Sequence, residues 1–453
     1  MTEYSRTCLA AVALTSLATC SMTAAEEKPN FIIILTDDQG YQDLGCFGSP
    51  LIKTPNVDKL AANGMKFTDF YVSCSVCTPS RFSLQTGLYP QQGKWKSTVV
   101  FPQQNVTMFK EGQQTIADVL KAKGYATAAI GKWHLGHQKS EYLPTGHGYD
   151  YYYGIPYSND MGGWKGMPFA KDVVFGKGNS KEVYDVSKRN GPPLMQNDKV
   201  IEYPVDQVTL TKRYTDEAVK FIKENKNKSF YLFVSHSMPH VPLYSGKDFQ
   251  GKSKRGPYGD AIEEVDWSVG QIVKTLQENN LNSKTLILYT SDNGPWLNKK
   301  DHGGSALPLR DGKKSTWEGG PRVPTVISWP GHIPADKVCN KVASTMDVLP
   351  TFAKLAGAKL PNYPLDGHDI SQMIFSPHTL SKLEYLFYTA ARGQIDSIRH
   401  GKWKLHQNAL YDLDQDIGEQ KNLASKYPEV VSKLQKTLST YQSKYKNNQP
   451  KRK

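Results

Sequence analysis

The stretch FIIILTDD, Phe31 to Asp38, sets the architecture of this 453-residue chain. Its five consecutive apolar residues are typical of a strand that is buried on both faces, as in a parallel sheet, and two aspartates follow directly after Thr36. Short apolar runs and helical patterns alternate after this strand, which indicates an α/β domain with a large, mainly parallel sheet flanked by helices. The composition, 38% hydrophobic and 22% charged, is that of a soluble globular protein.

The apolar patterns place the main elements. We predict strands at Phe31–Leu35, Tyr125–Ile130, Ser229–His236 and Lys284–Thr290, and helices at Thr54–Gly64, Thr115–Gly124, Tyr214–Asn225 and Ile262–Asn280. Between Tyr149 and Val205 a Gly-, Pro- and Tyr-rich region has no clear period, and we expect long loops there. From about Leu380 the pattern changes to meandering antiparallel strands, and a last helix runs from Tyr427 to about Tyr445. The prediction is a large domain over residues 26–378 and a smaller C-terminal α+β subdomain, with an antiparallel sheet and a basic tail, over residues 379–453.

The first 25 residues have the pattern of a secretory signal peptide. An apolar run from Cys8 to Ala25 lies behind Arg6 and ends in small residues, and it is too short to span a membrane. Cleavage after Ala25 would release a periplasmic or secreted protein, whereas lipoprotein-type processing would leave a lipid anchor on Cys20. Thr19 before that cysteine is atypical for a lipoprotein. No later segment is long and apolar enough to be an integral membrane span, so we expect an exported protein.

Export permits disulfides, but Cys46, Cys74, Cys77 and Cys339 are too few to hold a chain of this length together. The fold must therefore rest on its hydrophobic core.

The net charge of +13 is concentrated at the C-terminal end, where seven basic residues and no acidic one follow Val431. A solvated helix with a frayed basic end accounts for these charges, and attraction to a polyanion is the alternative. Nucleic acid is not an expected partner, because the chain is exported and has no recognisable binding motif. A sulfated or carboxylated polysaccharide fits better.

Polar clusters follow four of the predicted strands. They are Asp37-Asp38, Lys132 with His134, His236 to His240, and Asp292-Asn293. Ligands of open parallel sheets bind beyond the carboxyl ends of the strands, so these clusters can converge on one site. Each cluster alone is better explained as a turn or a helix cap, but four together favour a site.

The residue types define the chemistry of that site. Asp37, Asp38, Asp292 and Asn293 offer oxygen ligands, which suit a hard ion such as Ca²⁺ or Mg²⁺. The side chains that can add positive charge or move protons are Arg81, Lys132, Lys313, His134 and His240. A hard cation among fixed cations and histidines suits a phosphate or sulfate ester.

Cys77 lies in SCSVCTPSRFSLQTG, Ser73 to Gly87. A redox pair with Cys74 would need a thioredoxin-like unit, and a zinc site would need a second Cys-x-x-Cys, which the sequence lacks. A cysteine phosphatase would use Cys-x5-Arg, whereas Arg81 gives Cys-x3-Arg. Burial of an inert thiol stays open.

The local pattern around Cys77 favours an anion site. With Pro79 expected at the first helical position, Thr78 or Cys77 as the cap and Gly87 at the end, position 77 would face the helix N-terminus. A soft thiolate suits a hard cation poorly, so an oxygenated group would fit better there.

Several blocks of the sequence resemble those of type I, formylglycine-dependent sulfatases of the alkaline phosphatase superfamily. CTPSRFSLQTG, Cys77 to Gly87, is similar at every fixed position to the signature Cys-x-Pro-Ser-Arg-x-x-Leu-x-Thr-Gly, and GYATAAIGKWHLG, Gly124 to Gly136, resembles the second signature. LTDDQGYQDLGCFG, PHVP, SDNGP and LRDGKKSTWEGGPRVP resemble further blocks in order. The resemblance is strong from about Lys28 to Gly357 and nearest to the branch of arylsulfatase A and galactosamine-6-sulfatase. It implies an alkaline-phosphatase-like fold, with residues 26–378 as the catalytic domain.

The resemblance implies that a separate maturation enzyme, formylglycine-generating or anaerobic, oxidises Cys77 to formylglycine. One hydroxyl of the formylglycine hydrate would attack sulfur, and Asp292 would accept its proton. The implied ligands of Ca²⁺, or alternatively Mg²⁺, are Asp37, Asp38, Asp292, Asn293 and the modified Cys77.

The remaining roles are also carried over from the resemblance. Arg81 and Lys132 would orient the diol and neutralise charge, and His240 with Lys313 would grip sulfate and protonate the leaving oxygen. His134 would take a proton from the second hydroxyl and so expel sulfate. His236 would either pack against the catalytic residues and hold them in position or contact the substrate.

Two features depart from the family pattern. Asp311 and Lys314 occupy variable places, so Lys313 is assigned by its position after Gly312. Cys74 is not required by the signature, and we expect it to pack in the core or to pair with Cys46.

Two rival functions are weighed against sulfate ester hydrolysis. A phosphodiester or phosphonate monoester hydrolase of the same superfamily can share Cys-x-Pro-Ser-Arg, but GKWHLG and SDNGP favour sulfate. An unmodified pseudo-sulfatase that binds sulfated glycans is the other alternative, and the presence of all the catalytic residues argues against it.

The expected export and the net positive charge favour a sulfated sugar as the substrate, such as a galactose or N-acetylgalactosamine sulfate of carrageenan or chondroitin. Candidate sugar contacts in loops are Asn159, Asp160, Trp164, His302 and Arg392.

Overall fold

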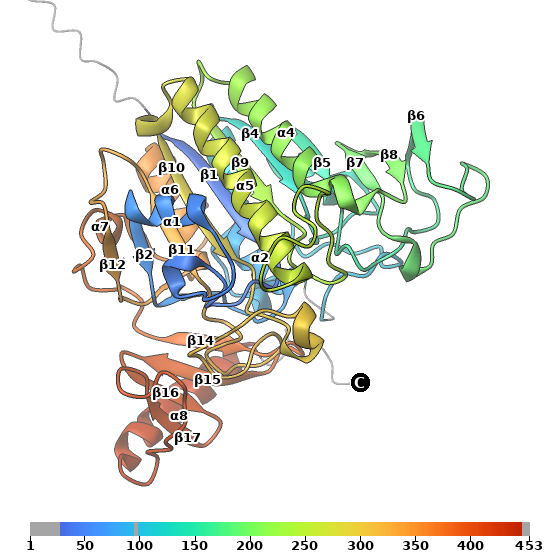
Figure 1. Ribbon diagram of the computed structural model, residues 1–453. Helices are drawn as coiled ribbons and strands as arrows, with labels where there is room; N and C mark the ends of the chain where they lie inside the picture. Colours follow the sequence, from blue (N-terminus) through green and yellow to red (C-terminus); the bar gives the residue numbers. More distant parts are fainter. Residues whose placement is uncertain (1–27, 95–97, 446–453) are drawn as a thin grey trace, which may run out of the picture.

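The structure is a computed structural model that describes residues 28–94 and 98–445 (Figure 1). The predicted signal peptide, with Cys8 and Cys20, lies outside these residues, as do the last basic residues from Lys446 onward. Within the described residues, no helix combines the length and the apolar composition needed to cross a membrane.

An eleven-stranded mixed sheet forms the centre of the molecule, with strand order β12-β2-β11-β10-β1-β9-β4-β5-β7-β8-β6. Its middle is parallel: β1 (Asn30–Thr36) lies between β10 (Thr285–Ser291) and β9 (Phe230–Ser235), and β4 (Ala126–Gly131) follows β9. The four strands predicted for the core of the sheet are thus confirmed and adjacent. The other strands of this sheet are β2 (Met65–Phe67), β5 (Tyr151–Gly154), β6 (Phe169–Phe175), β7 (Leu194–Gln196), β8 (Lys199–Tyr203), β11 (Thr325–Ser328) and β12 (Lys337–Cys339). A separate two-stranded sheet joins β3 (Phe70–Tyr71) to β13 (Ala343–Ser344).

The expectation of long loops between Tyr149 and Val205 holds for residues 155–168 and 176–193 but misses β5 to β8, which lie in the same region and extend the sheet. These strands are difficult to recognise in sequence. β7 has only three residues, and β6 is largely exposed, so neither shows a sustained apolar alternation.

Helices cover both faces of the sheet. They are α1 (Pro55–Ala62), α2 (Cys77–Thr86), α3 (Ile116–Lys121), α4 (Leu210–Glu224), α5 (Pro257–Glu278), α6 (Val348–Ala356) and α7 (Ser371–Phe375). Alternate residues of β1 point to opposite faces, as the period of a strand requires. Ile32 and Ile34 join the core beneath α1, α4 and α5, the helices at the front of Figure 1.

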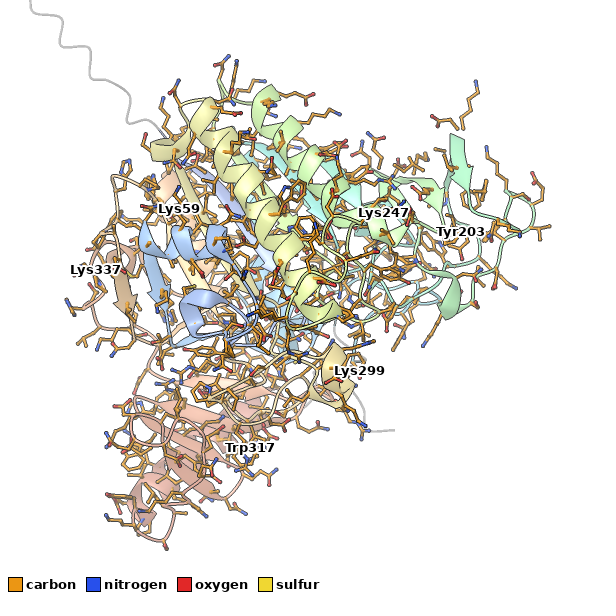
Figure 2. All side chains as sticks on the ribbon, viewed as in Figure 1. Lys59, Tyr203, Lys247, Lys299, Trp317 and Lys337 are labelled. Carbon is orange, nitrogen blue, oxygen red and sulfur yellow. The ribbon has the colours of Figure 1, made fainter. Side chains whose placement is uncertain are left out.

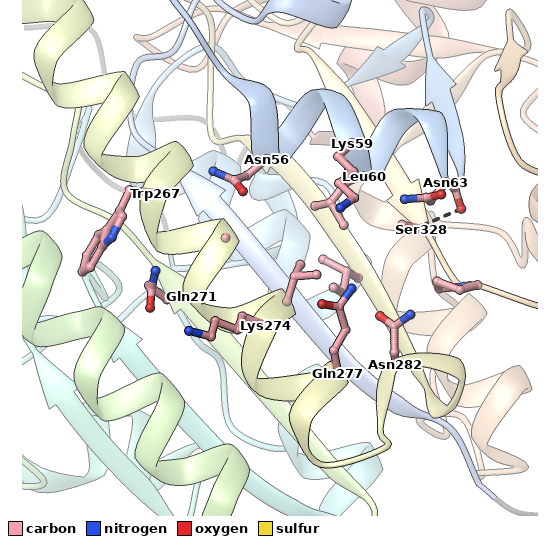
Figure 3. Close-up of a pocket in the computed structure, with 14 residues that line it drawn as sticks. Asn56, Lys59, Leu60, Asn63, Trp267, Gln271, Lys274, Gln277, Asn282 and Ser328 are labelled. Carbon is pink, nitrogen blue, oxygen red and sulfur yellow. Dashed lines mark hydrogen bonds between the residues drawn. The ribbon is translucent and has the colours of Figure 1, made fainter.

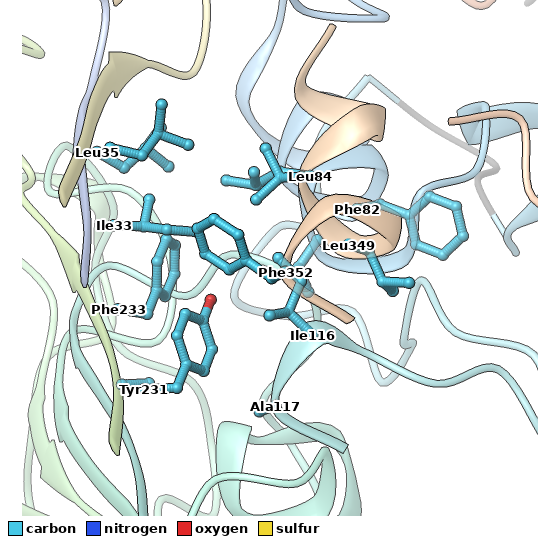
Figure 4. Close-up of a cluster of buried hydrophobic side chains, with 14 of the residues drawn as sticks. Ile33, Leu35, Phe82, Leu84, Ile116, Ala117, Tyr231, Phe233, Leu349 and Phe352 are labelled. Atoms are coloured by element: carbon cyan, nitrogen blue, oxygen red, sulfur yellow. The ribbon is translucent and has the colours of Figure 1, made fainter. Parts of the chain in front are cut away.

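The opposite face of β1 packs against α2, α3 and α6. Phe31, Ile33 and Leu35 belong to this second core, and Figure 4 shows Ile33 and Leu35 beside Phe352 of α6. The Phe31 ring stacks on that of Phe352 at 4.3 Å. Because this core lies directly under α2, it fixes the helix that begins at Cys77.

The C-terminal part forms the predicted antiparallel sheet and helix. Its strands run in order from β14 (Leu386–Thr389) through β15 (Ile395–His400) and β16 (Trp403–His406) to β17 (Ala409–Asp412). The helix α8 (Pro428–Tyr445) buries Leu434 and Leu438 in a small core with β15, β16 and β17.

A buried network of charges, called the junction cluster below, connects this C-terminal sheet to the main domain. The ammonium of Lys404, on β16, lies 3.0 Å from a carboxylate oxygen of Glu318 and 2.7 Å from one of Glu419. Asp69 receives hydrogen bonds of 2.8 Å from Arg322 and from Arg399. Arg310 also donates to the backbone carbonyl of Glu419 at 2.9 Å. The segment from Leu309 to Pro324, which carries Lys313, is therefore held by the C-terminal sheet.

Candidate active site

The structure brings the four polar strand ends together at the carboxyl edge of the parallel strands. In the pairing of β1 with β10, Thr36 lies opposite Ser291, so Asp37 and Asp292 leave the sheet side by side. Ligand atoms of Asp37, Asp38, Cys77 and Asp292 all lie within 4.8 Å of one another, and all four residues are buried. Residues more than 250 positions apart in the sequence thus form one compact group.

Cys77 is the first residue of α2, and its side chain faces this group. The Sγ atom lies 3.4 Å from Oδ1 of Asp37 and 3.6 Å from the ammonium of Lys313. The predicted cap is wrong: the extended residue Val76 precedes the helix, and Pro79 is its third residue rather than its first. The helix begins two residues before Pro79, and Val76 before it makes no side-chain cap. The backbone N–H groups at 77 and 78 therefore lie at the helix N-terminus. Gly87, with φ of 70°, ends the helix as predicted.

Three cations surround the carboxylates. Arg81 donates through Nε to Asp292 at 2.8 Å and through Nη1 to the hydroxyl of Ser235 at 2.6 Å. The ammonium of Lys132 lies 2.5 Å from Asp37, and that of Lys313 lies 2.6 Å from Asp38. The three carboxylates and three cations, called the site cluster below, balance in charge.

The two central carboxylates respond differently to this environment. Burial would raise the pKa of Asp37, but Lys132, His240 and Arg81 hold it well below its usual range. Burial, together with the negative charge of Asp37, raises the pKa of Asp292 to about 6. Burial and the carboxylates of Asp292 and Asp37 also raise the pKa of the Cys77 thiol well above its usual value. An unmodified Cys77 is therefore a neutral thiol, which is a poor nucleophile.

His134 has one ring nitrogen engaged and one free. Its Nε2 lies 3.1 Å from the carbonyl of Val100, which makes Nε2 the N–H donor, and Nδ1 has no partner among the described residues. Burial, Lys132 and Arg81 lower the pKa of this imidazole well below its usual value. The side chain is thus neutral, with a bare lone pair on Nδ1, the form in which a histidine accepts a proton. Its backbone has a φ of 65°, an uncommon conformation for a residue with a side chain.

His240 is held by Asn159. The Nδ1 of His240 lies 3.0 Å from Oδ1 of Asn159 and 2.6 Å from the carbonyl of Val241, both acceptors. The proton is therefore on Nδ1, and Nε2 is directed toward Asp38 at 3.6 Å and toward Ser158 at 3.5 Å. The amide nitrogen of Asn159 donates to the carbonyl of Pro242 at 3.0 Å, which fixes its orientation. Asn159 is buried and orients His240, so it does not fit the predicted role of a sugar contact.

The donor set fits a hard divalent cation. Asn293 donates through Nδ2 to Asp38 at 2.7 Å, which leaves its Oδ1 buried without a hydrogen-bond partner among the described residues. An orphaned oxygen beside three gathered carboxylates is the arrangement that a bound Ca²⁺ or Mg²⁺ would complete. The residues that would hold it are Asp37, Asp38, Asp292, Asn293 and position 77.

Among the other predicted contacts, His236 and Trp164 lie in the core. His236 is fully buried with its ring near Tyr214 of α4, and burial lowers its pKa to about 4. Trp164 is 2% exposed and packs edge-on against His137 at 4.8 Å. Neither contributes surface to a substrate, and the prediction of a sugar contact at Trp164 is wrong, because an aromatic residue between glycines was buried rather than displayed.

The remaining candidates keep exposed surface. Asp160 is half-buried next to Asn159, His302 is exposed at the end of the short helix η8 (Leu297–His302), and Arg392 is exposed in a turn. Their contact with a substrate stays a prediction.

Three residues near the site were not predicted. Ser235 and Ser158 lie one position before His236 and Asn159, where their hydroxyls contact Arg81 and approach Lys132 and His240. The ring of Trp296, two residues after Gly294, lies 5.6 Å from that of His240. Ser235 and Trp296 adjoin motif blocks, which was the only signal in the sequence.

The proposed pairing of Cys74 with Cys46 is wrong. Cys46, Cys74, Cys77 and Cys339 all have free thiols, and Cys74 is buried with its sulfur 3.7 Å from the carbonyl of Ala390. It packs against the loop after β14, in agreement with the other expectation, that Cys74 is a packing residue.

A hollow of about 570 Å³ between α1 and α5 is separate from this site (Figure 3). Amides and two lysines line it, including Asn63, Gln271 and Lys274, and none of the described residues that line it is a His, Cys, Asp or Glu. Its described lining therefore offers no carboxylate, imidazole or thiol for catalysis.

Comparisons with known proteins agree with this site. The sequence profile of the family described as Sulfatase matches residues 29–358, and the profile described as N-sulphoglucosamine sulphohydrolase, C-terminal, matches residues 311–444. Arylsulfatase A of Bos taurus is 36% identical over 92% of this chain and 87% of its own length. N-acetylgalactosamine-6-sulfatase of Sus scrofa is 36% identical over 78% of this chain and 67% of its own. The crystal structure of Ps i-CgsB in complex with k-i-k-neocarrahexaose aligns with a TM-score of 0.78 at 30% identity, over 91% of this chain and 92% of that one.

Proposed function

The chain belongs to the sulfatase family of the alkaline phosphatase superfamily and hydrolyses sulfate esters, and we propose that it does so on a sulfated oligosaccharide or polysaccharide through formylglycine made from Cys77. The observation that carries the proposal is the group of Cys77, three carboxylates and Asn293 at one sheet edge, ringed by Arg81, Lys132, Lys313 and two histidines. Ps i-CgsB, a structural relative at 30% identity, binds a neocarrahexaose, and this supports the proposal of a carbohydrate substrate for the present chain.

Two added groups would complete the site. A divalent cation, Ca²⁺ or Mg²⁺, held by Asp37, Asp38, Asp292 and Asn293, would polarise a sulfate oxygen and favour the ionised nucleophile. Formylglycine at position 77 would supply, as its hydrate, two hydroxyls on one carbon, one for attack on sulfur and one for the later release of sulfate.

Asp292 would accept the proton of the nucleophile. Its carboxylate belongs to the same 4.8 Å group as the Cys77 side chain, and a pKa of about 6 leaves it ionised but basic at neutral pH. Arg81 and Lys132 hold Asp292 and Asp37 in place and keep positive charge beside the reacting oxygen atoms.

His240 and Lys313 would grip the sulfate and serve the leaving alcohol. Burial, followed by the charge of Lys313, lowers the pKa of His240 in the free site. An arriving sulfate would offset Lys313 and raise that pKa, so substrate itself would prepare His240 to donate a proton.

His134 would deprotonate the second hydroxyl and so release sulfate. Its bare Nδ1 and lowered pKa suit a base, and the hydroxyl of Thr78 in α2 donates to its backbone carbonyl at 2.9 Å. The same helix thus sets both position 77 and its base.

The finer assignments are part of the proposal. Residues 1–25 would be a signal peptide, 26–378 the catalytic domain and 379–453 the C-terminal subdomain, in an exported enzyme matured by a formylglycine-forming enzyme. Galactose or N-acetylgalactosamine sulfates are the proposed substrates, in line with the activity named for the Sus scrofa relative.

Rates on three model substrates test the reaction class. The matured, Ca²⁺-loaded enzyme is expected to hydrolyse an aryl sulfate faster than an aryl phosphodiester or phosphonate monoester. A faster phosphodiester reaction would overturn the sulfatase assignment. A panel of oligosaccharides with defined sulfate positions then identifies the sugar.

A further inference from the structure

Three lysines gather around one tryptophan at the edge of the site. The ammonium groups of Lys299, Lys314 and Lys313 lie 4.4, 4.5 and 4.7 Å from the centre of the Trp296 ring. Trp296 is half-buried, and Lys299 and Lys314 are exposed (Figure 2 labels Lys299 on the short helix after β10). The segment from Trp296 to Lys314 holds five basic residues and two acidic ones. This is a local excess of positive charge over an aromatic face.

Two of these lysines lack an anion. Lys313 pairs with Asp38, but neither Lys299 nor Lys314 forms an ion pair with any carboxylate of the described chain. Burial, followed by the positive charge of Lys313, lowers the pKa of Lys314. Cation–π contacts at exposed positions are weaker than charge-assisted hydrogen bonds, so an anion would draw these lysines off the ring.

The position of Trp296 relates the cluster to the substrate. Its ring lies 5.6 Å from the ring of His240 and 4.7 Å from the ammonium of Lys313, the two groups assigned to the leaving oxygen. The alcohol that leaves must therefore start beside Trp296. A ring face freed of its lysines is apolar and flat, which suits the C–H face of a sugar.

The backbone holds this arrangement in an uncommon conformation. Lys300 has φ of 53° and Lys314 has φ of 79°, both in the left-handed region. The N–H of Lys314 donates to the carbonyl of Ser75 at 2.9 Å, next to α2. Strained residues of this kind cluster at ligand sites, where the surrounding structure holds them.

We infer that Trp296, Lys299 and Lys314 form a subsite for a second anionic group on the leaving oligosaccharide, so that the preferred substrate class carries a further sulfate or carboxylate near the scissile sulfate. This inference rests on the proposed function, since it assumes that the alcohol leaves past His240 and Lys313. The sugar packs on the Trp296 face, and Lys299 and Lys314 bind the second anion.

Inhibition of aryl sulfate hydrolysis measures this subsite without a known natural substrate. The inhibitors are three galactose-based oligosaccharides of equal length, carrying one sulfate, two sulfates, or one sulfate and one uronate. In the matured, Ca²⁺-loaded enzyme, the two-anion sugars are expected to bind about tenfold more tightly than the monosulfated one, the gain of one charge-assisted hydrogen bond. Comparison of the uronate-bearing sugar with the doubly sulfated one shows whether the subsite prefers a carboxylate or a sulfate as the second anion.

Charge-removing variants assign the effect to residues. Lys299→Gln and Lys314→Gln are each expected to remove most of that tenfold difference and to leave aryl sulfate turnover unchanged, whereas Lys300→Gln, which loses the same charge from the same segment, should keep it. Trp296→Phe should retain binding, and Trp296→Ala should weaken all three sugars.

The outcomes separate this inference from the proposed function. Equal binding of all three sugars by the wild type, or an equal effect of Lys300→Gln and Lys299→Gln, would overturn the subsite while aryl sulfate turnover upholds the sulfatase. Absence of aryl sulfate turnover in the matured wild type would overturn both.

Discussion

The site cluster and the junction cluster each bury three carboxylates with three cations, yet they leave different atoms unpaired. In the junction cluster, Glu318 faces Lys404, Arg322 and the hydroxyls of Tyr71 and Tyr388. Oε1 of Glu419 accepts no hydrogen bond there, but it lies 2.7 Å from the ammonium of Lys404. In the site cluster, one guanidinium nitrogen of Arg81, Oδ1 of Asn293 and Nδ1 of His134 have no hydrogen-bond partner among the described residues. Equal charge counts thus support a structural role in one place and ligand binding in the other.

The carboxylate pKa values follow this difference. Burial would raise the pKa of Glu318, but Lys404, Arg322 and Arg399 lower it to about 2. Burial, followed by the negative charge of Asp37, raises the pKa of Asp292 to about 6, although Arg81 and Lys132 act in the opposite direction. Glu419 of the junction also has its pKa raised by burial, but the ammonium of Lys404 lies 2.7 Å from its carboxylate. At the site, a bound cation would take the place of such a partner for Asp292 and would add stability.

The largest predicted effect is at Cys77. Cys77→Ala should lower the turnover of an aryl sulfate at least ~10³-fold, because the nucleophile is lost. The fold and the affinity for sulfate should remain, because the cations and the helix N-terminus remain. Initial rates, circular dichroism and inhibition by sulfate check these points. Turnover like that of the wild type would refute the assignment of Cys77. It would also refute the claim that the site cluster, unlike the junction cluster, serves catalysis.

The second prediction concerns the junction cluster. Lys404→Met should lower the free energy of unfolding by about 3–5 kcal/mol, because two buried carboxylates lose their shared cation. Lys402→Met is the matched control: its pair with Asp412, at 2.7 Å, is 45% exposed on the lysine side, so the loss should stay below about 1 kcal/mol. Denaturant unfolding measures both.

The acid sensitivity of the junction extends that test. Glu318 has a pKa of about 2, below its ordinary value, so its contribution to stability is present above the ordinary pKa and is lost as pH falls through about 2. The wild type should lose this contribution under acid, and Lys404→Met should show a weaker dependence on pH. An unchanged dependence would show that Lys404 does not set the pKa of Glu318.

The third prediction concerns cation binding at the site. Ca²⁺ at a hundredfold excess over its dissociation constant should stabilise the protein by about 2.7 kcal/mol at neutral pH. The stabilisation should shrink below pH 6, because the raised pKa of Asp292 lets protons compete there. Asn293→Ala should weaken the response and Lys404→Met should preserve it. Thermal unfolding with Ca²⁺, Mg²⁺ or a chelator distinguishes these cases, and an equal response in Asn293→Ala would contradict the ligand assignment.

The smallest predicted effect is at Asn159. Asn159→Ala should lower kcat about tenfold, because the Nδ1 of His240 loses one of its two acceptors and keeps only the carbonyl of Val241, so its ring is less firmly oriented. Asn159→Asp keeps the acceptor at position 159 and should recover part of the rate. A purely structural role would instead lower stability and leave the pH profile of kcat unchanged, which the same assays would reveal.

The sequence was most informative where a buried strand ends in polar residues. The strand Phe31 to Leu35 and its aspartates could be predicted, because a continuous apolar run followed by charges is rare outside a sheet edge. The motif blocks then supplied the roles of Arg81, His134 and Lys313. The strand and these site residues could be predicted because each is marked by a pattern of neighbouring residues in the sequence.

The rest depends on contacts that no local pattern encodes. Asn159 could not be distinguished from a sugar-binding amide, because its orienting role depends on His240, 81 positions away. Trp164 looked like a loop aromatic until its packing against His137 was known. The junction cluster joins Glu318 to Lys404 across 86 positions, and neither residue stands out in the sequence.

The most direct test of the account is the mass of the peptide that spans Cys77, taken from enzyme with measured aryl sulfate turnover. In the active fraction, the account predicts a peptide about 18 Da lighter than the encoded one, the covalent change from cysteine to formylglycine. Full activity in a preparation whose peptide carries only unmodified cysteine would contradict it.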